Sequence, residues 1–263
     1  MKNLKILFVL TLLSVYACSQ NDKQELTYTM VALENRSIEA DTSAANATVI
    51  KLNYPKIIST NSEVIKKCIQ DSIDKFILSE MFDIAKMDQH ENMLKQFINE
   101  YENFKKDFPD YKLRWYLIKN VKVIFSNNQI ISLAMINDSF TGGAHPNYTK
   151  YFMNLDLDRG SKIKLSDIIV DDKISELNKI AERKFREINN LDSVKTLSDL
   201  GYWFENDKFE VNENFAITAE GITFYYNSYE IAPYSLGQTT LFISYKDLDG
   251  IISVDKYKLT VNN

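Results

Sequence analysis

The chain has few of the residues from which covalent and metal-based sites are built. Its 263 residues include two cysteines, two histidines, seven glycines and four prolines. Two histidines cannot form a zinc site with several histidine ligands. The HExxH, GxSxG, CxxC and P-loop patterns do not occur. These absences argue against several classes of hydrolase, dithiol oxidoreductase and nucleotide-binding enzyme, and they predict neither a cofactor nor a metal ion.

Positive charge is also in short supply. Lysine and arginine number 31 against 36 aspartates and glutamates, a net charge of −5. Loss of an N-terminal leader, residues 1–17, would remove Lys2 and Lys5 and leave a net charge of −7. A chain with this balance has no overall attraction to nucleic acid or to an anionic lipid surface. We therefore expect no nucleic-acid partner.

The N-terminus has the pattern of a secretory leader. Two lysines precede Ile6–Ala17, an apolar run of 12 residues, whereas a spanning helix needs about 20. The run ends in Val15-Tyr16-Ala17-Cys18, which resembles the lipobox of bacterial lipoproteins. We predict that residues 1–17 are a lipoprotein signal peptide and that Cys18 becomes the acylated first residue. Ordinary secretion, with a cysteine there by chance, is the alternative.

Lipid attachment would decide where the protein resides. Several acyl chains anchor a protein durably, since each buried methylene contributes about 0.8 kcal/mol. Residues 18–24 are polar and would tether the domain to the membrane, its expected partner. Ser19 follows the cysteine, which resembles the signal for the outer membrane. We expect a lipid-anchored protein of the cell envelope, in the outer membrane, whose remaining Cys68 forms no internal disulfide.

Alternating hydrophobic residues predict a set of antiparallel strands. The expected strands are residues 26–33, 48–54, 115–125, a return strand from 131 into the Gly-Gly loop, 149–157, 215–218, 222–226 and 239–245, with 254–261 as an edge strand or tail. The second strand is expected to end at Pro55, and Lys119 is expected on the polar side of the third. Asn127-Asn128 predicts a two-residue hairpin turn, because asparagine tolerates positive φ.

Helical periods separate these strands. Three main helices are expected, at about 64–77, 88–108 and 173–188. The capping-box pattern Thr60-Asn61-Ser62-Glu63 precedes the first helix, whose apolar stripe, beginning at Val64, includes Cys68. The third is expected to turn Ile174 and Ile188 inward. The order predicts an α+β fold of antiparallel sheets, formed by meanders and packed with about three main helices.

The stretch SFTGGAHPNY, residues 139–148, is the most unusual loop. It holds the Gly-Gly pair and one of the two histidines. Gly142-Gly143 permits positive φ, and His145 precedes a proline and must be extended. The pattern predicts a rigid connection between two strands that projects His145 and Tyr148. The other histidine, His90, is expected on the solvated side of its helix.

Two further groups of residues invite a functional interpretation. The acidic pairs Asp156/Asp158 and Asp247/Asp249 lack the order of a calcium loop, and they are expected to be turn residues. Four tyrosines occur between residues 225 and 234. Of these, Tyr229 and Tyr234 are candidates for an amphipathic surface that contacts a protein or a glycan. Tyrosines that cover a small core are the alternative.

Two segments carry a family resemblance. TGGAHPNYTKYFMNLDLDRGSKIKLSDII, from Thr141, combines Gly-Gly-Ala-His, a strand with Asn-x-Asp, a glycine turn and Leu-x-Asp before a helix. ITFYYNSYEIAPYSLGQTTLFISYKDL, from Ile222, carries Tyr-x-Ile-x-Pro-Tyr-x-x-Gly. Both segments resemble the RsiV-like family, and the resemblance extends over about Glu25 to Leu248.

The resemblance implies a non-catalytic sensory or binding protein with an α+β fold. Residues 146–263 would form its RsiV-like half, and residues 25–145 a half of the type associated with polysaccharide deacetylases. The best-known member of the family binds lysozyme and releases a sigma factor. A lysozyme-like muramidase or a cell-wall glycan is therefore the implied partner. Because the chain shows neither an anti-sigma segment nor a deacetylase domain, we expect binding without direct control of a sigma factor.

Three functions remain open on the sequence alone. The first is a non-enzymatic, ligand-binding envelope lipoprotein, with Gly142, Gly143, His145 and Tyr148, together with the two tyrosines Tyr229 and Tyr234, as candidate binding residues. The second is a hydrolase of envelope polymers that pairs His145 with a carboxylate, Asp138 or Asp156. The third is a structural envelope lipoprotein. The missing catalytic motifs and the resemblance favour the first.

Replacement of Cys18 by serine tests the predicted lipid anchor. The thiol is the acceptor for the lipid, so Cys18→Ser should give an unprocessed or soluble protein. Fractionation and mass spectrometry of the N-terminus measure both properties. Unchanged processing and membrane partition of the variant would contradict the prediction.

Overall fold

The computed structural model describes residues 26–37, 47–79, 90–253 and 257. The expected signal peptide, Cys18, the tether, the 38–46 loop and most of the 254–261 strand lie outside the described residues. The described strands are β1 (Thr27–Arg36), β2 (Val49–Ser59), β3 (Tyr116–Ser126), β4 (Ile130–Phe140), β5 (Asn147–Asp156), β6 (Ser161–Lys162), β7 (Phe215–Ile217), β8 (Gly221–Tyr226) and β9 (Thr239–Ser244). The described helices are α1 (Glu63–Leu78), α2 (His90–Asp107) and α3 (Ile174–Ile188), with 3-10 turns η2 (Leu165–Asp167), η3 (Ser198–Leu200), η4 (Glu205–Asp207) and η5 (Tyr234–Leu236). None of these helices has the length and apolar character of a membrane span.

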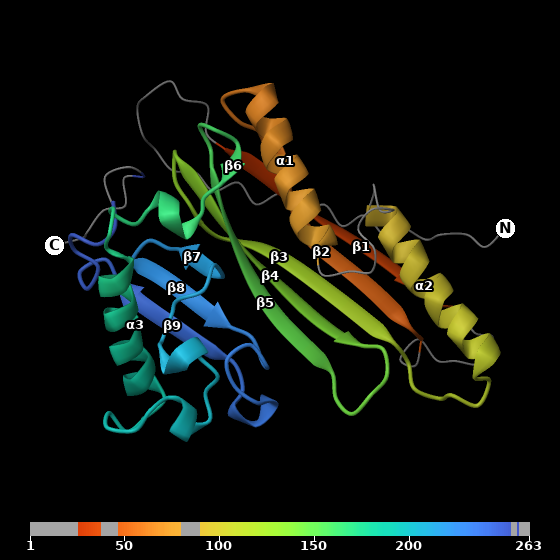
Figure 1. The fold of residues 1–263 in the computed structure, drawn as a ribbon. Helices are drawn as coiled ribbons and strands as arrows, with labels where there is room; N and C mark the ends of the chain where they lie inside the picture. Colours follow the sequence, from red (N-terminus) through yellow and green to blue (C-terminus); the bar gives the residue numbers. More distant parts are fainter. Residues whose placement is uncertain (1–25, 38–46, 80–89, 254–256, 258–263) are drawn as a thin grey trace. The chain divides into compact units, whose positions relative to one another are not determined.

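The strands form two sheets (Figure 1). One has six strands in the order β1-β2-β3-β4-β5-β6, and the other has three in the order β7-β8-β9. β2 and β3 pair in parallel. The pairs β1–β2, β5–β6, β7–β8 and β8–β9 are antiparallel. The predicted α+β class, with mainly antiparallel sheets and three main helices, is confirmed.

The chain divides into two compact units, and each is described by itself. The first unit comprises residues 1–122 and 135–149, and the second comprises 123–134 and 150–263. The division therefore passes through β3, β4 and β5. In the first unit α1 packs on β2, and α2 packs on β1 and β2 (Figure 1). In the second unit α3 packs against β9.

Helix α1 lies close to its expected range, but its N-cap is two residues later than Thr60, the first residue of the capping-box pattern. Its N-cap is Ser62, whose hydroxyl oxygen accepts a hydrogen bond from the Val64 amide at 3.2 Å. Thr60 instead bonds the backbone of Ser62. Because the helix starts at Glu63, Val64 lies in the exposed first turn and not on the apolar stripe. Cys68 is partly buried beside that stripe.

Two predictions about the strands, at Pro55 and Lys119, were wrong because they depend on which elements pack beside each strand. β2 continues past Pro55, which lies opposite Met30 of β1. In the described pairing, β2 is hydrogen-bonded to β3 over Val49–Asn53. Pro55 lies beyond these residues, so the N–H that proline lacks is not required for pairing with β3. Lys119 faces the core, on the same face of β3 as the buried Leu117 and Val121. Neither position could be assigned without knowing which strands and helices adjoin it.

Lys119 is buried because it caps a helix. Its ammonium group donates to the carbonyl oxygens of Ile77 at 2.6 Å and Ser79 at 3.0 Å. These carbonyls belong to the C-terminal end of α1, where free oxygens and the negative end of the helix dipole attract a cation. A charge that the sequence pattern assigned to solvent therefore joins β3 to α1.

The hairpin and the third helix are present with differences in detail. Asn127 closes the β3–β4 turn by accepting the amides of Gln129 at 2.8 Å and Ile130 at 2.9 Å with its side-chain oxygen. Asn127 and Asn128 are not among the described positive-φ residues, so the turn depends on side-chain bonding.

In α3, Ile174 and Ile188 are exposed at the two ends, contrary to prediction, since the core covers only the middle of the helix.

Asparagine side chains join β5 to the β7–β8 hairpin in the second unit. The buried Asn154 donates to the Phe215 carbonyl at 2.9 Å and accepts the Ile217 amide at 2.9 Å. Asn214 accepts the Phe152 amide at 2.8 Å and donates to the Lys150 carbonyl at 2.9 Å. Each side-chain amide thus acts as an inserted peptide group and satisfies backbone that strand pairing would otherwise satisfy.

Replacement of Asn154 by alanine should destabilise the protein by about 2–4 kcal/mol. The variant leaves a buried carbonyl and a buried amide without their partner, and it opens a small cavity. Denaturant unfolding measures the loss. Asn128→Ala, at an exposed position of the β3–β4 turn, is the matched control and should change stability by less than about 0.5 kcal/mol. Equal effects of the two substitutions would contradict the bridging role.

Candidate functional site

A strained turn projects Tyr229 from the second unit. The Asn227 carbonyl accepts the Glu230 amide at 3.1 Å, which closes a β-turn with Tyr229 at its third position. Tyr229 has φ of 66°, a conformation that glycine or asparagine usually takes at this position. The Glu230 carboxylate closes the turn further by accepting the Asn227 amide at 2.8 Å. A bulky residue held in this region is a reason to look for function.

Tyr229 lies beside the other sequence-predicted tyrosine. The ring centroids of Tyr229 and Tyr234 are 5.6 Å apart, with 32° between the ring planes. Tyr229 is 57% exposed and Tyr234 is 44% exposed, so the pair is not a cover for the core. Tyr225 and Tyr226, by contrast, are buried. Two of the four tyrosines are therefore core residues and two are exposed; a contact of the exposed pair with a protein or a glycan stays a prediction.

Two residues that the sequence did not single out extend this surface. The Trp203 amide donates to the Ile231 carbonyl at 2.7 Å, which places Trp203 on a loop that adjoins the tyrosine loop. Gly201 of the same loop lies close to Leu236, because a Cβ on Gly201 would stand 3.5 Å from the Leu236 Cδ1. Trp203 and Leu236 are both exposed. We call Trp203, Tyr229, Tyr234 and Leu236 the aromatic surface.

The aromatic surface belongs to an acidic part of the chain. Between residues 199 and 230, one base, Lys208, stands against seven acids, a net charge of −6: Asp199, Glu205, Asp207, Glu210, Glu213, Glu220 and Glu230. Glu205 and Glu230 are exposed and lie close in sequence to Trp203 and Tyr229. Exposed carboxylates close in sequence to exposed aromatic rings favour a partner that combines apolar area with positive charge.

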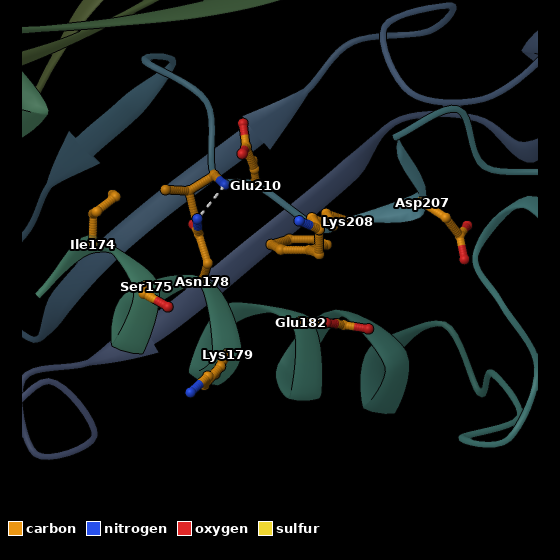
Figure 2. Close-up of a pocket in the computed structure, with 10 residues that line it drawn as sticks. Ile174, Ser175, Asn178, Lys179, Glu182, Asp207, Lys208 and Glu210 are labelled. Carbon is orange, nitrogen blue, oxygen red and sulfur yellow. Dashed lines mark hydrogen bonds between the residues drawn. The ribbon is translucent and has the colours of Figure 1, made fainter. Parts of the chain in front are cut away.

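A groove of about 550 Å³ lies between α3 and the segment 207–211 (Figure 2). Asn178 of α3 accepts the Val211 amide at 3.1 Å and so fixes the segment to the helix. The charged side chains that line the groove are of both signs: Lys179, Glu182, Asp207, Lys208 and Glu210. Charged side chains of both signs that do not converge on one point form no reaction centre in this groove.

The Gly-Gly loop lies in the first unit. Gly142 and Gly143 have φ of 108° and 101°, which confirms the predicted positive φ. A Cβ on Gly142 would stand 3.2 Å from the Tyr111 hydroxyl oxygen, whereas Gly143 has nothing within 4 Å. The Tyr111 hydroxyl is buried and has no hydrogen-bond partner among the described residues. Tyr111, which the sequence did not indicate, therefore supports the loop.

His145 and Tyr148 are exposed on this loop, as expected. The Nδ1 of His145 lies 2.9 Å from the carbonyl oxygen of Pro146, and because a carbonyl only accepts, Nδ1 is the donor. Asp156, one of the carboxylates suggested as its partner, belongs to the second unit and is engaged in its own turn. It accepts the amides of Asp158 and Arg159 and pairs with the Arg159 guanidinium at 2.8 Å. Asp156 is thus the turn residue that the sequence predicted.

The other suggested carboxylate, Asp138, lies beside the Tyr116 phenol. Desolvation, together with the charge and hydrogen bonding of Asp138, raises the pKa of Tyr116. Among the described residues, no group of three or more histidine, cysteine, aspartate or glutamate side chains is arranged to hold a metal ion.

His90 is not the solvated histidine that the sequence predicted. Its side chain is 10% exposed, and its Nε2 lies 3.5 Å from the Asp74 carboxylate. The ring packs edge-on against Tyr54, with centroids 4.6 Å apart. Desolvation lowers the pKa of His90; Asp74 opposes this effect, and the charge of Lys119 adds to it. The first turn of α2 is covered by α1 and β2, which a helical period alone cannot show.

The comparisons with known proteins divide the chain in two. Residues 41–148 match a family model described as deacetylase PdaC, and residues 166–246 match one described as a protein of unknown function, DUF3298. The Gly-Gly loop lies in the first match, and the aromatic surface lies in the second. No curated protein matches the chain. This two-part arrangement fits the RsiV-like architecture that the sequence resemblance implied.

Two solved structures share the fold. One is a member of the DUF3298 family from Bacteroides fragilis, 21% identical, with a TM-score of 0.68 over 87% of this chain and 94% of that one. The other is a DUF3298 family protein from Pseudomonas aeruginosa, 20% identical, with a TM-score of 0.60 over 88% and 95% of the two chains. At this level of identity the likeness establishes the fold alone.

Alanine substitutions at the two glycines should differ in their coupling to Tyr111. Each places a Cβ at positive φ and should destabilise the protein by about 1–3 kcal/mol. Gly142→Ala also meets the Tyr111 hydroxyl, so Tyr111→Phe should restore about 0.5–1 kcal/mol in that background. Gly143→Ala is the control, in which Tyr111→Phe should restore nothing. Thermal and denaturant unfolding of the single and double variants measure these free energies. If neither glycine variant loses stability, the loop has no fixed conformation and the prediction is wrong.

Proposed function

We propose that the protein is a non-enzymatic lipoprotein of the cell envelope that binds a basic, lysozyme-like muramidase through its aromatic surface. The observation that carries this proposal is the exposed, strained Tyr229 paired with Tyr234 inside an acidic segment. The RsiV-like resemblance supports the ligand class, and the DUF3298 and PdaC matches support a role at the cell envelope. The predicted lipid anchor supports the envelope location.

The aromatic surface has the composition of an interaction hot spot. Tyrosine and tryptophan supply large contact areas with few rotatable bonds, and they dominate binding energy where they are buried by a partner. The turn already holds Tyr229 outward, so little conformational freedom remains to be lost on binding. The fold thus maintains a conformation at Tyr229 that packing alone would not favour, and binding explains why the bulky ring stands there.

The acidic segment would contribute mainly to the rate of association. Charges around an interface steer an oppositely charged partner and raise its association rate, and salt weakens this effect. A net charge of −6 between residues 199 and 230 is suited to a basic enzyme. A neutral glycan would gain nothing from it. We therefore place the muramidase ahead of the cell-wall glycan as the ligand.

His145 has no chemical role in this proposal. Its exposed ring is bonded to the neighbouring Pro146 carbonyl, and its position on the Gly-Gly loop suits a surface contact. Gly142 and Gly143 would act by shaping that loop, and Tyr148 by adding an exposed ring. We assign these four residues to a secondary contact, because they lie in the first unit.

Substitutions in the aromatic surface should separate binding from stability. Tyr234→Ala and Trp203→Ala should each weaken binding of lysozyme by about tenfold or more. Tyr229→Gly should weaken it similarly while leaving the melting temperature unchanged or raised, because glycine relieves the positive φ. Val194→Ala, at an exposed apolar position of the second unit, is the control and should bind normally. Isothermal calorimetry at low and high salt, with thermal melts, measures both properties.

The outcomes that would contradict the proposal are specific. No complex at tens of micromolar protein, at low salt, would remove a lysozyme-like muramidase as the ligand. Binding of soluble cell-wall fragments that depends on Trp203 would replace it with a glycan. Hydrolysis of envelope polymer that is lost in His145→Ala would show that the protein is an enzyme.

A further inference from the structure

The end of α2 forms an exposed apolar tip on the first unit. Phe108 is 57% exposed and Leu113 is 54% exposed, although both are large and apolar. Three cationic residues with exposed side chains accompany them in the same stretch: Lys106, Lys112 and Arg114. We call these five residues the basic tip. Apolar side chains surrounded by cations are the pattern of a surface that meets an anionic, partly apolar partner.

The basic tip is firmly supported from beneath. The Lys105 ammonium donates to the carbonyl oxygens of Pro109 at 3.0 Å and Tyr111 at 2.6 Å. Phe104 packs against Phe108 and Tyr111, with ring centroids 4.8 Å and 4.9 Å away. These contacts fix the turn that follows α2. Phe108 is therefore held outward by a built structure, and its exposure is not a consequence of a loose chain end.

The charge of the chain is divided unevenly between the two units. The first unit, residues 1–122 and 135–149, contains 17 lysines and arginines against 17 aspartates and glutamates, a net charge of 0. The second unit, residues 123–134 and 150–263, contains 14 against 19, a net charge of −5. The excess of positive charge in the first unit is local: residues 105–114 hold four bases and two acids.

We propose that the basic tip docks on a membrane surface that carries anionic lipid headgroups. Phe108 and Leu113 would enter the headgroup region, and the lysines and the arginine would contact lipid phosphates. Charge complementarity selects this occupant: a neutral surface would not attract the cations, and a basic protein would be repelled. Docking goes beyond the proposed function, because it uses the first unit and requires no muramidase.

The geometry of the first unit allows a tethered chain to reach the membrane with this tip. The tip adjoins the Arg36 end of β1, since Arg36 pairs with Val49 and the Val49 amide donates to the Trp115 carbonyl at 3.1 Å. The ten residues of β1 span about 33 Å. The nine Cα–Cα steps from Cys18 to Thr27 can span at most about 30 Å. A tether of this reach allows a lipid-anchored chain to place the tip at the bilayer with β1 lying along it.

Fluorescence quenching in vesicles tests the docking directly. The full chain, held in vesicles by its own N-terminus, carries Trp115→Phe and Trp203→Phe, which remove both native tryptophans, and a reporter, Phe108→Trp. Vesicles contain phosphatidylcholine with or without phosphatidylglycerol, and a nitroxide-labelled lipid quenches tryptophan near the headgroups. We expect the reporter at 108 to be quenched in the anionic vesicles and not in the neutral ones. Phe242→Trp, at a position of the second unit that is 44% exposed, is the matched reporter and should not be quenched.

Removal of charge completes the test. Lys106→Gln with Lys112→Gln should reduce the docked population about 25-fold, about fivefold for each cation. Lys179→Gln with Lys208→Gln removes two exposed cations from the second unit and should change nothing. Equal quenching at positions 108 and 242, or quenching that survives loss of Lys106 and Lys112, would overturn the proposal. Soluble polyphosphate that binds the tip while anionic vesicles do not would also overturn it, in favour of a phosphate polymer. A muramidase-binding experiment is unaffected by any of these outcomes.

Discussion

Asn227 shows how the second unit depends on side-chain amides that take the place of strand pairing. Its oxygen accepts the Lys150 amide at 2.8 Å, and its nitrogen donates to the Lys150 carbonyl at 3.2 Å. Its own backbone closes the turn that carries Tyr229. With Asn154 and Asn214, it joins β5 to the β7–β8 hairpin in the same way. Because a buried backbone group without a partner is costly, these amides set both the position of the hairpin and the conformation of the candidate binding surface.

Much of the fold could be predicted from hydrophobic periods. Strands β4, β5, β8 and β9 and helices α2 and α3 lie close to their expected ranges, because each has a face that must be buried. The errors occur at Pro55, Lys119 and His90. Each of them depends on which element lies alongside, and a period of two or 3.6 residues carries no information about neighbours. The asparagine bridges were missed for the same reason.

The candidate site was predictable only in part. Tyr229 and Tyr234 stood out because aromatic residues cluster there, and the structure places their rings in contact. Trp203 lies more than 20 residues before Tyr229 in the sequence, in a segment without helical or strand periodicity. The one sequence feature that could have indicated its role is an isolated aromatic residue. Total charge was misleading in a different way. A sum over the chain averages the basic stretch 105–114 with the acidic stretch 199–230, so it described neither surface.

Lys119 has a consequence for how the first unit excludes other arrangements. In a strand, a shift by one residue exchanges the two faces. Such a shift in β3 would remove the ammonium group from the Ile77 and Ser79 carbonyls and would direct Ile118 toward them in its place. A hydrophobic residue could tolerate either register, whereas a buried cation tolerates only the one that brings it to the end of α1. Lys119 therefore specifies one register of β3 relative to α1.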